Sequence, residues 1–181
     1  MRKSRKFWLP LTVSSNDPVD GDTAFDGSEP AELYWEQFYG EPIEWVEPKT
    51  NWTADDYYNF YDLNAVEINT EAIAQILEQY LKIIVNIITF TQRDMTRIEF
   101  FYEMNRIEGN IGALANAFYT PPGWEEPKTT WQSGLPGGGF SYRDANRLER
   151  NLYLLYKLIE SAIDSLRYCG TFTCGEEDLI I

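Results

Sequence analysis

The chain has 181 residues, a length that suits one domain, or one domain with an extended arm. Hydrophobic residues make up 44% of it, which supplies enough side chains for a packed core and argues against wholesale disorder. The net charge of −14 argues against binding to free nucleic acid, because phosphate binding depends on Lys and Arg.

The first residues are a local exception, since four basic side chains lie within six positions. Such a basic tip could dock onto an acidic neighbour, including another copy of the chain, or it could be a solvated terminus. The apolar run from Phe7 to Val13 is barely long enough for the apolar region of a signal peptide, is interrupted by Pro10 and is followed by no small-x-small cleavage site, so we expect no export. No run approaches the ~20 apolar residues that a membrane helix requires, so we expect no membrane partner. The four basic residues are Arg2, Lys3, Arg5 and Lys6.

Residues 1–50 are acidic and rich in aromatic side chains, and we predict that they form an extended arm. Gly, Ser, Pro and acidic residues alternate between positions 14 and 30, which is typical of turns. A short helix is predicted from Pro30 to Tyr39. The aromatic rings that follow could anchor a protein interface, stack on a sugar, or simply fasten the arm to the body. The candidate interface aromatics are Trp35, Trp45, Trp52, Tyr57 and Tyr58.

Residues 51–181 form the predicted helical body, in which one pattern occurs three times at a spacing of 41 residues. The pattern is aromatic-x-acid-x-Asn-x-aliphatic-Glu-x-Asn, and it starts at Phe60, Phe101 and Tyr142. Agreement by chance at six positions in three copies is hard to credit. Its polar residues are Asp62, Asn64, Glu67, Asn69, Glu103, Asn105, Glu108, Asn110, Asp144, Asn146, Glu149 and Asn151.

Each copy has the features of a helix start, with side chains that can cap backbone N–H groups and apolar residues at helical spacing afterwards. The first helix could continue to Ile88, although its β-branched end also permits a strand. A long Pro- and Gly-rich loop over 119–140 leaves no room for the second helix of a HEAT-like unit. The third helix should end near Cys169, before a short C-terminal tail. We therefore predict a mainly α fold, a three-helix bundle with an extended N-terminal arm.

The repeated Asn and Glu share one face of each predicted helix, opposite the apolar face. They could form hydrogen-bonded clamps between helices or subunits, together with Arg106 and Arg147. Alternatively, they could cap their own helices locally and otherwise face solvent. The first copy departs from the pattern, because Ala65 stands where the other two copies have arginine.

Catalysis has little support in this sequence. There is no histidine, the carboxylates follow no recognisable acid–base frame, and no nucleotide-binding fingerprint occurs. Cys169 and Cys174 alone are too few for a structural zinc site. They are expected to be two small buried side chains, or a disulfide in an oxidising setting. We predict no enzymatic activity, no cofactor and no metal.

Three stretches carry a resemblance to a known class of proteins: Trp52 to Asn64 with Val66–Glu67, Met104 to Asn110, and Leu166 to Phe172. They resemble small tail or baseplate-type virion structural proteins of phages and prophages of Gram-positive bacteria, over roughly residues 50–175. This resemblance implies a non-enzymatic component of the tail, baseplate or connector, assembled in the host cytoplasm. It would pack with itself and with other virion proteins. The alternative is a receptor- or carbohydrate-binding module at the tail tip, with a host cell-surface glycan as its ligand.

Overall fold

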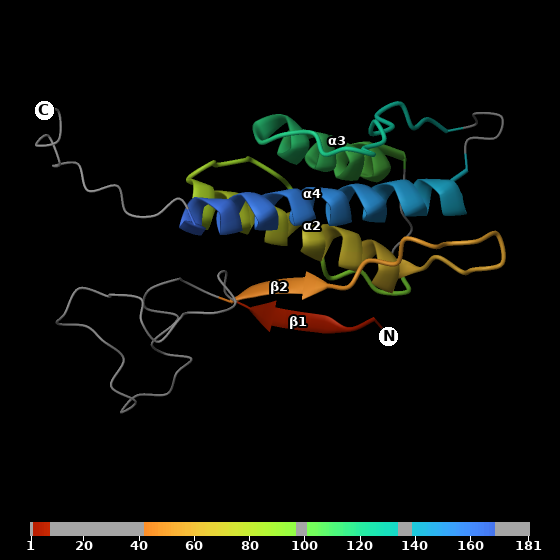
Figure 1. Cartoon of the computed structure of the whole chain (residues 1–181). Coiled ribbons are helices and arrows are strands. Elements are labelled where there is room, and N and C mark those ends of the chain that lie inside the picture. Colours follow the sequence, from red (N-terminus) through yellow and green to blue (C-terminus); the bar gives the residue numbers. More distant parts are fainter. Residues whose placement is uncertain (1, 8–41, 97–100, 134–138, 169–181) are drawn as a thin grey trace, which may run out of the picture.

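Three helices dominate the computed structural model, which describes residues 2–7, 42–96, 101–133 and 139–168. The helices are α2 (Phe60–Leu81), α3 (Phe101–Ala117) and α4 (Tyr142–Tyr168), and the strands are β1 (Ser4–Phe7) and β2 (Ile43–Val46) (Figure 1). The prediction of a mainly helical chain is confirmed. The helix predicted from Pro30 to Tyr39, Trp35 and both cysteines lie outside the described residues.

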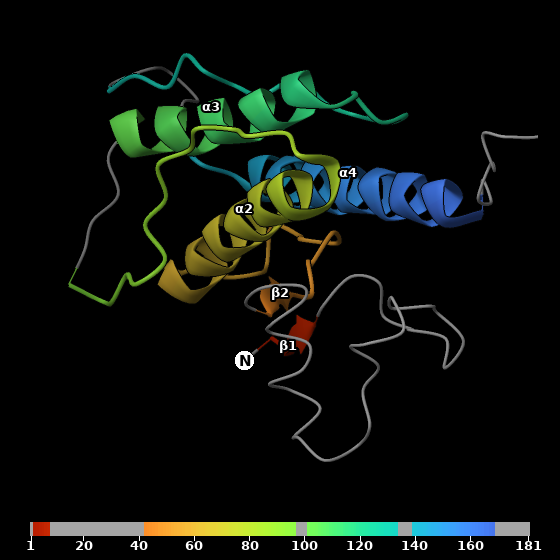
Figure 2. The ribbon, with the colours of Figure 1, turned by 90° about the vertical axis from the view of Figure 1, so that its left-hand side faces the viewer.

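The three helices lie side by side, and each contacts the other two. Their N-terminal ends lie at the same end of the molecule, on the right in Figure 1 and on the left in Figure 2. Parallel helices require connections that return along their whole length. The segments after α2 and α3 make these return passes along the outside of the helices (Figure 2).

The ends of α2 follow from its sequence. Asn59 forms a capping box with Asp62: Asn59 Oδ1 accepts from the Tyr61 N–H at 2.9 Å, and Asp62 Oδ2 accepts from the Asn59 N–H at 3.0 Å. Lys82, with φ of 57°, ends the helix in the left-handed conformation. The helix therefore stops before the β-branched run that follows, and the possible extension to Ile88 is not observed.

The core lies between the helices and consists of the apolar residues at helical spacing. Each fully buried Leu or Ile contributes roughly 1.5–3 kcal/mol relative to an exposed one. Its leucines and isoleucines with no more than 1% exposure on the helices are Ile73, Ile76, Leu77, Ile107, Ile111, Leu114, Leu148, Leu152, Leu155 and Ile159.

The two strands pair antiparallel, with Ser4 opposite Val46 and Phe7 opposite Ile43. Strand β2 packs on α2, and its side chains Ile43 and Trp45 are buried in the same core. The end of the predicted arm is thus part of the hydrophobic core. Within the described part of the chain, every helix is too short or too polar to cross a membrane.

Candidate functional site

Three glutamates, one from each helix, are almost completely buried. Glu67, Glu108 and Glu149 are each 1% exposed, and each lies in the second turn of its helix. A buried carboxylate is costly unless it is paired and hydrogen-bonded. The partners of these three side chains therefore define the site.

Two of the glutamates are paired with an arginine from the next helix in the sequence. Arg106 donates from Nη1 and Nη2 to the two oxygens of Glu67, both at 2.7 Å, and from Nη2 to Glu103, one turn earlier in α3, at 2.8 Å. Arg147 makes the corresponding contacts from α4, with Glu108 and, at 3.0 Å, with Asp144. Each arginine therefore joins the acid three residues before it to the buried glutamate of a neighbouring helix.

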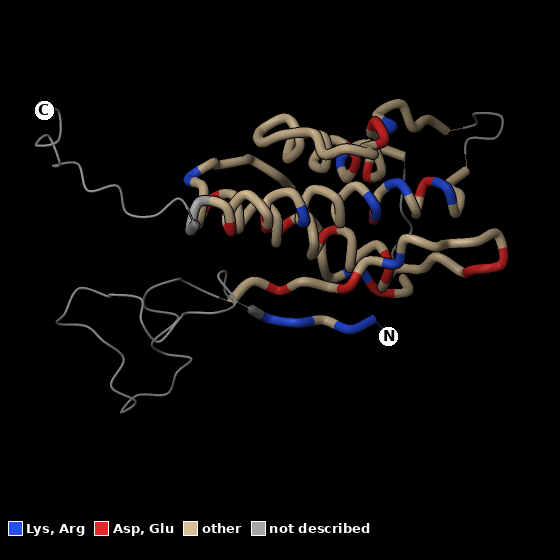
Figure 3. Tube along the Cα trace, viewed as in Figure 1, with Lys and Arg blue, Asp and Glu red and all other residues tan. Residues whose placement is uncertain are grey.

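The third glutamate is paired in a different way, because α2 has Ala65 at the position of these arginines. Arg2, just before β1, takes their place. Its Nη2 lies 2.9 Å from Asp62, which precedes Ala65 by three residues, and 2.9 Å from Glu149, whose other oxygen accepts from Nη1. The guanidinium also lies over the ring of Trp52, 5.1 Å from its centroid. Arg2 therefore reproduces from a distant strand the contacts that Arg106 and Arg147 make from a helix. Figure 3 shows the basic residues of this strand beside the acidic residues of the body.

The first asparagine of each motif binds both polar groups of one residue in an extended segment. Its Oδ1 accepts the backbone N–H and its Nδ2 donates to the carbonyl of the same residue. All six distances lie between 2.8 and 3.0 Å. The pairs are Asn64 with Arg93, Asn105 with Trp131, and Asn146 with Trp52.

The second asparagine repeats this contact on the segment that precedes its own helix. Asn69 binds Val46 at 2.8 and 2.7 Å. The longest of these bonds, at 3.5 Å, is donated by the backbone N–H of Ile88, an exposed residue, to Asn110 Oδ1. An extended backbone needs such side-chain partners for those polar groups that no neighbouring strand satisfies. The other two pairs are Asn110 with Ile88, and Asn151 with Glu125.

The buried glutamates complete the clamps by accepting a backbone N–H between the two asparagine contacts. The donors are Phe90 for Glu67 at 2.7 Å, Lys128 for Glu108 at 3.0 Å, and Lys49 for Glu149 at 2.6 Å. Each extended segment is thereby fixed to two helices. Segment 46–52 joins α2 to α4, segment 88–93 joins α3 to α2, and segment 125–131 joins α4 to α3. The three clamps together connect the helices in a closed ring.

One further donor faces each glutamate from position 52, 93 or 131. The indole Nε1 of Trp52 donates to Glu149 at 2.8 Å, and Arg93 donates to Glu67. Trp131 occupies the third position. Its indole N–H is buried and makes no hydrogen bond of good geometry with the described residues, although it opposes the rise in the pKa of Glu108. Glu149 is thus better supplied with donors than Glu108.

The pKa values reflect the competition between burial and pairing. Burial raises the pKa of Glu108 and of Glu149 above the ordinary value, and the bonds from Arg147 and Arg2 oppose this rise. Burial acts in the same direction on Asp144, but hydrogen bonds from Ser141 and the charge of Arg147 outweigh it and lower the pKa. Because their pKa values are raised, keeping these two glutamates ionised in the folded state lowers the stability of the fold.

The candidate interface aromatics occupy different environments. Trp45 is 1% exposed and stacks on Tyr156 with ring centroids 4.3 Å apart, and Trp52 is 6% exposed. Tyr58 is half-buried against Trp52, whereas Tyr57 is 91% exposed. Trp45 and Trp52 therefore contribute to the interior of this chain and leave little ring surface for a partner.

Other aromatic side chains are exposed where the helices begin. Tyr61, Phe101, Tyr102 and Tyr142 lie in the first turn of α2, α3 or α4, and they are between 38 and 65% exposed. The N-terminal ends of the three helices lie at the same end of the molecule, so the residues of these first turns lie there too, and Tyr57 precedes α2 by three positions. We call this surface the aromatic end.

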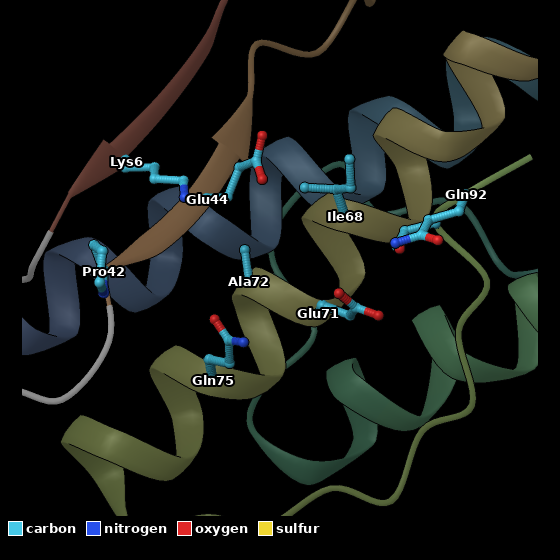
Figure 4. A pocket seen from close by; sticks show the side chains of 9 residues that line it. Lys6, Pro42, Glu44, Ile68, Glu71, Ala72, Gln75 and Gln92 are labelled. Atoms are coloured by element: carbon cyan, nitrogen blue, oxygen red, sulfur yellow. The ribbon is translucent and has the colours of Figure 1, made fainter.

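The pockets along the clamps are open rather than enclosed. One, of about 350 Å³, lies between β2 and α2 and is shown in Figure 4, with Lys6, Glu44 and Glu71 at its edge. Another, of about 510 Å³, adjoins Arg2, Asp62 and Ala65. Within the described residues, no three side chains of the types that bind metals gather into one group.

Comparisons with protein-family models, with curated proteins and with solved structures found no match for this chain.

The twelve polar motif residues and the two helical arginines were predicted from the sequence, whereas their partners from outside the helices were not. For Arg2, the sequence indicated only a basic tip that could dock onto an acidic neighbour, and it gave no specific partner. Arg93 was not expected, and neither was the use of asparagine to bind extended backbone. One signal was available for Arg2: the first copy lacks an arginine at Ala65, while Glu149 in the third copy still requires a cation.

Proposed function

We propose that this chain is a non-enzymatic structural component of a phage virion, in the tail, baseplate or connector region. It acts by packing against copies of itself and other virion proteins. The proposal includes a finer architecture: a three-helix bundle in which an extended segment followed by a helix occurs three times, with helix motifs 41 residues apart.

The observation that carries the proposal is the internal use of the polar motif. All twelve motif residues bond within the chain, either to an extended backbone segment or to an arginine. Buried polar networks of this kind fix the register of the elements that they join. Residues used in this way favour a rigid building block over a site that must exchange substrates.

The aromatic end supports contact with other proteins. Four of its rings are exposed in the first turns of three different helices, at the first or second position of the motif. Contiguous exposed apolar surface is typical of protein interfaces, and rigid aromatic side chains lose little entropy when they bind.

The alternative of a glycan-binding module has less support. Sugar stacking requires an open ring face, and Trp45 and Trp52, the described tryptophans proposed for that role, are buried. Tyr57 remains exposed, and two acidic residues, Asp55 and Asp56, precede it directly in the chain.

The proposal is tested on the protein and on the particle. A variant with Tyr61→Ser and Tyr102→Ser should lose at least tenfold in self-association or in binding to isolated tails, measured by sedimentation velocity. The matched control is Tyr119→Ser, which removes a ring that is 72% exposed just beyond the other end of α3. Mass spectrometry should also detect the chain in purified particles. A chain that is absent from particles and stays monomeric beside tail proteins would overturn the proposal.

A further inference from the structure

The surface that receives β1 is a binding site made entirely by residues 42–168. Two acidic side chains, Asp62 and Glu149, receive Arg2, and the edge of β2 receives the strand backbone. The Glu47 N–H donates to the Lys3 carbonyl at 3.0 Å, which extends this backbone pairing. The site is incomplete without the strand, because Glu149 would otherwise be buried with no cation.

Side chains along β1 make further contacts with the same surface. Ser4 donates to Glu44 at 2.6 Å, and Arg5 donates to the Tyr156 hydroxyl at 3.3 Å. Tyr156 in turn donates to Glu160 at 3.2 Å. The strand is therefore recognised by an arginine anchor, by a β edge and by polar groups at two more positions.

Charge favours binding of this strand to any copy of the body. Residues 1–7 carry four positive charges and no negative charge, and the whole chain carries −14, so the remaining residues carry −14 − 4 = −18. Opposite charges at this density accelerate encounter and raise the local concentration of the strand near the acidic surface.

The segment that connects β1 to β2 is long enough for β1 to reach the same site on a second copy of the chain. Between β1 and β2 lie residues 8–42, and a chain of 35 residues can span up to roughly 120 Å. A helix as long as α4 measures only about 40 Å. The connection is therefore long enough to reach a neighbouring copy that lies beside the first.

We propose that residues 2–7 bind in the same site of a second copy, so that copies of this chain are joined by exchanged β1 strands. The contacts are those of Arg2 with Asp62 and Glu149 and of β1 with β2, made between chains. This inference rests on the proposed oligomeric function and names the contact that would produce it.

Lys6 and Glu44 provide a direct test, because they are paired opposite each other in the strand register and both are exposed. Facing residues in antiparallel strands have Cα atoms close enough for a disulfide. Two full-length chains are made on a background with Cys169→Ser and Cys174→Ser, one carrying Lys6→Cys and the other Glu44→Cys. They are mixed and oxidised, and the products are separated on a non-reducing gel.

Strand exchange predicts a disulfide-linked heterodimer whose yield rises with protein concentration. Mixing Glu44→Cys with a chain that carries Lys6→Cys and Arg2→Ala should lower the yield at least tenfold. Introducing Ala65→Arg into the Glu44→Cys chain should lower it similarly, because an arginine on the helix would occupy Asp62 and Glu149. Circular dichroism establishes that each variant is folded before mixing.

Two results would overturn the inference. The first is no heterodimer at any soluble concentration, while a single chain with both cysteines closes the disulfide within itself. The second is a heterodimer whose yield is indifferent to Arg2→Ala and to Ala65→Arg. Detection of the chain in particles without strand exchange would refute this inference alone, and exchange by a chain absent from particles would refute only the virion role.

Discussion

Two sites in the molecule each combine one arginine with two acidic side chains. One site lies between α3 and α4, and the other lies where the N-terminal segment meets α2 and α4. At the first, Arg147 reaches Glu108 from a helix whose packing already positions it. At the second, Arg2 reaches Glu149 across 147 positions of sequence and is held by a four-residue strand. One chemical requirement, a cation for each buried glutamate, is thus met in one place by a residue of a neighbouring helix and in the other by a residue far away in the sequence, and the two solutions should differ in their effect on stability.

The largest effect is expected at the helical arginine. Arg147→Ala would leave Glu108 buried without its cation and should lower the free energy of unfolding by about 3–5 kcal/mol. Urea denaturation followed by circular dichroism measures this loss. The control is Arg150→Ala, whose side chain is exposed and 3.8 Å from Glu125, and which should change stability by less than about 0.5 kcal/mol. A loss below about 1 kcal/mol for Arg147→Ala would contradict a structural role for the pair.

A smaller effect is expected at the strand. Arg2→Ala should lower the free energy of unfolding by about 2 kcal/mol, because Glu149 keeps hydrogen bonds from the Trp52 indole and the Lys49 N–H. The same urea titration applies, with Lys3→Ala, an exposed neighbour, as the matched control. An Arg2→Ala loss as large as that of Arg147→Ala would mean that the additional donor does not support Glu149.

A further variant moves the cation that binds Glu149 from the N-terminal segment to helix α2. Adding Ala65→Arg to the Arg2→Ala variant should restore more than half of the lost stability, or more than about 1 kcal/mol, because the new side chain starts from the position equivalent to Arg106 and Arg147. The open pocket beside Ala65 provides room for it. Ala65→Leu, which fills the pocket without a charge, should fail to rescue. Equal rescue by leucine would show that packing rather than charge limits this site.

The smallest effect concerns pH. Burial already raises the pKa of Glu149, and Arg2→Ala removes a cation that opposes this rise, so the folded variant binds a proton more tightly than the unfolded chain does. Its stability must then increase as the pH falls from the folded pKa toward the ordinary value of 4.5. The deficit relative to the unmutated chain should shrink by about 1 kcal/mol between pH 7 and pH 5. The lowered pKa of Asp144 acts in the opposite direction, but it is common to both proteins and cancels in the difference. A deficit that grows on acidification would have the wrong sign.

The helices were predictable because their signals are local. The capping box at Asn59, the start of each helix at its motif and the apolar spacing behind it all lie within a few turns of sequence. The end of α2 was ambiguous, since β-branched residues after Leu81 are compatible with either conformation. The parallel arrangement of the helices was not predicted, because it depends on return segments whose only signal is an apolar run or a Pro-rich loop.

The candidate site was predictable only from the helix side. The helical arginines and the shared face of Asn and Glu indicated clamps, and Arg106 and Arg147 do make such contacts. The asparagines bind backbone N–H and carbonyl groups of the extended segments. Almost any residue supplies these groups, so the sequence does not indicate which residues are bound. The signal for Arg2 was only indirect, the missing arginine at Ala65, because a cation outside the helices has no periodicity that points to its distant partner.

The separation between Arg2 and Glu149 also has a consequence during translation. Residue 2 leaves the ribosome before its partner has been synthesised, and at 5–20 residues per second the interval is roughly 7–30 s. Throughout that time the basic strand has no carboxylate of α4 to bind in its own chain. A nascent chain therefore passes through a stage in which a finished neighbour on the same polysome offers the earliest available acceptor.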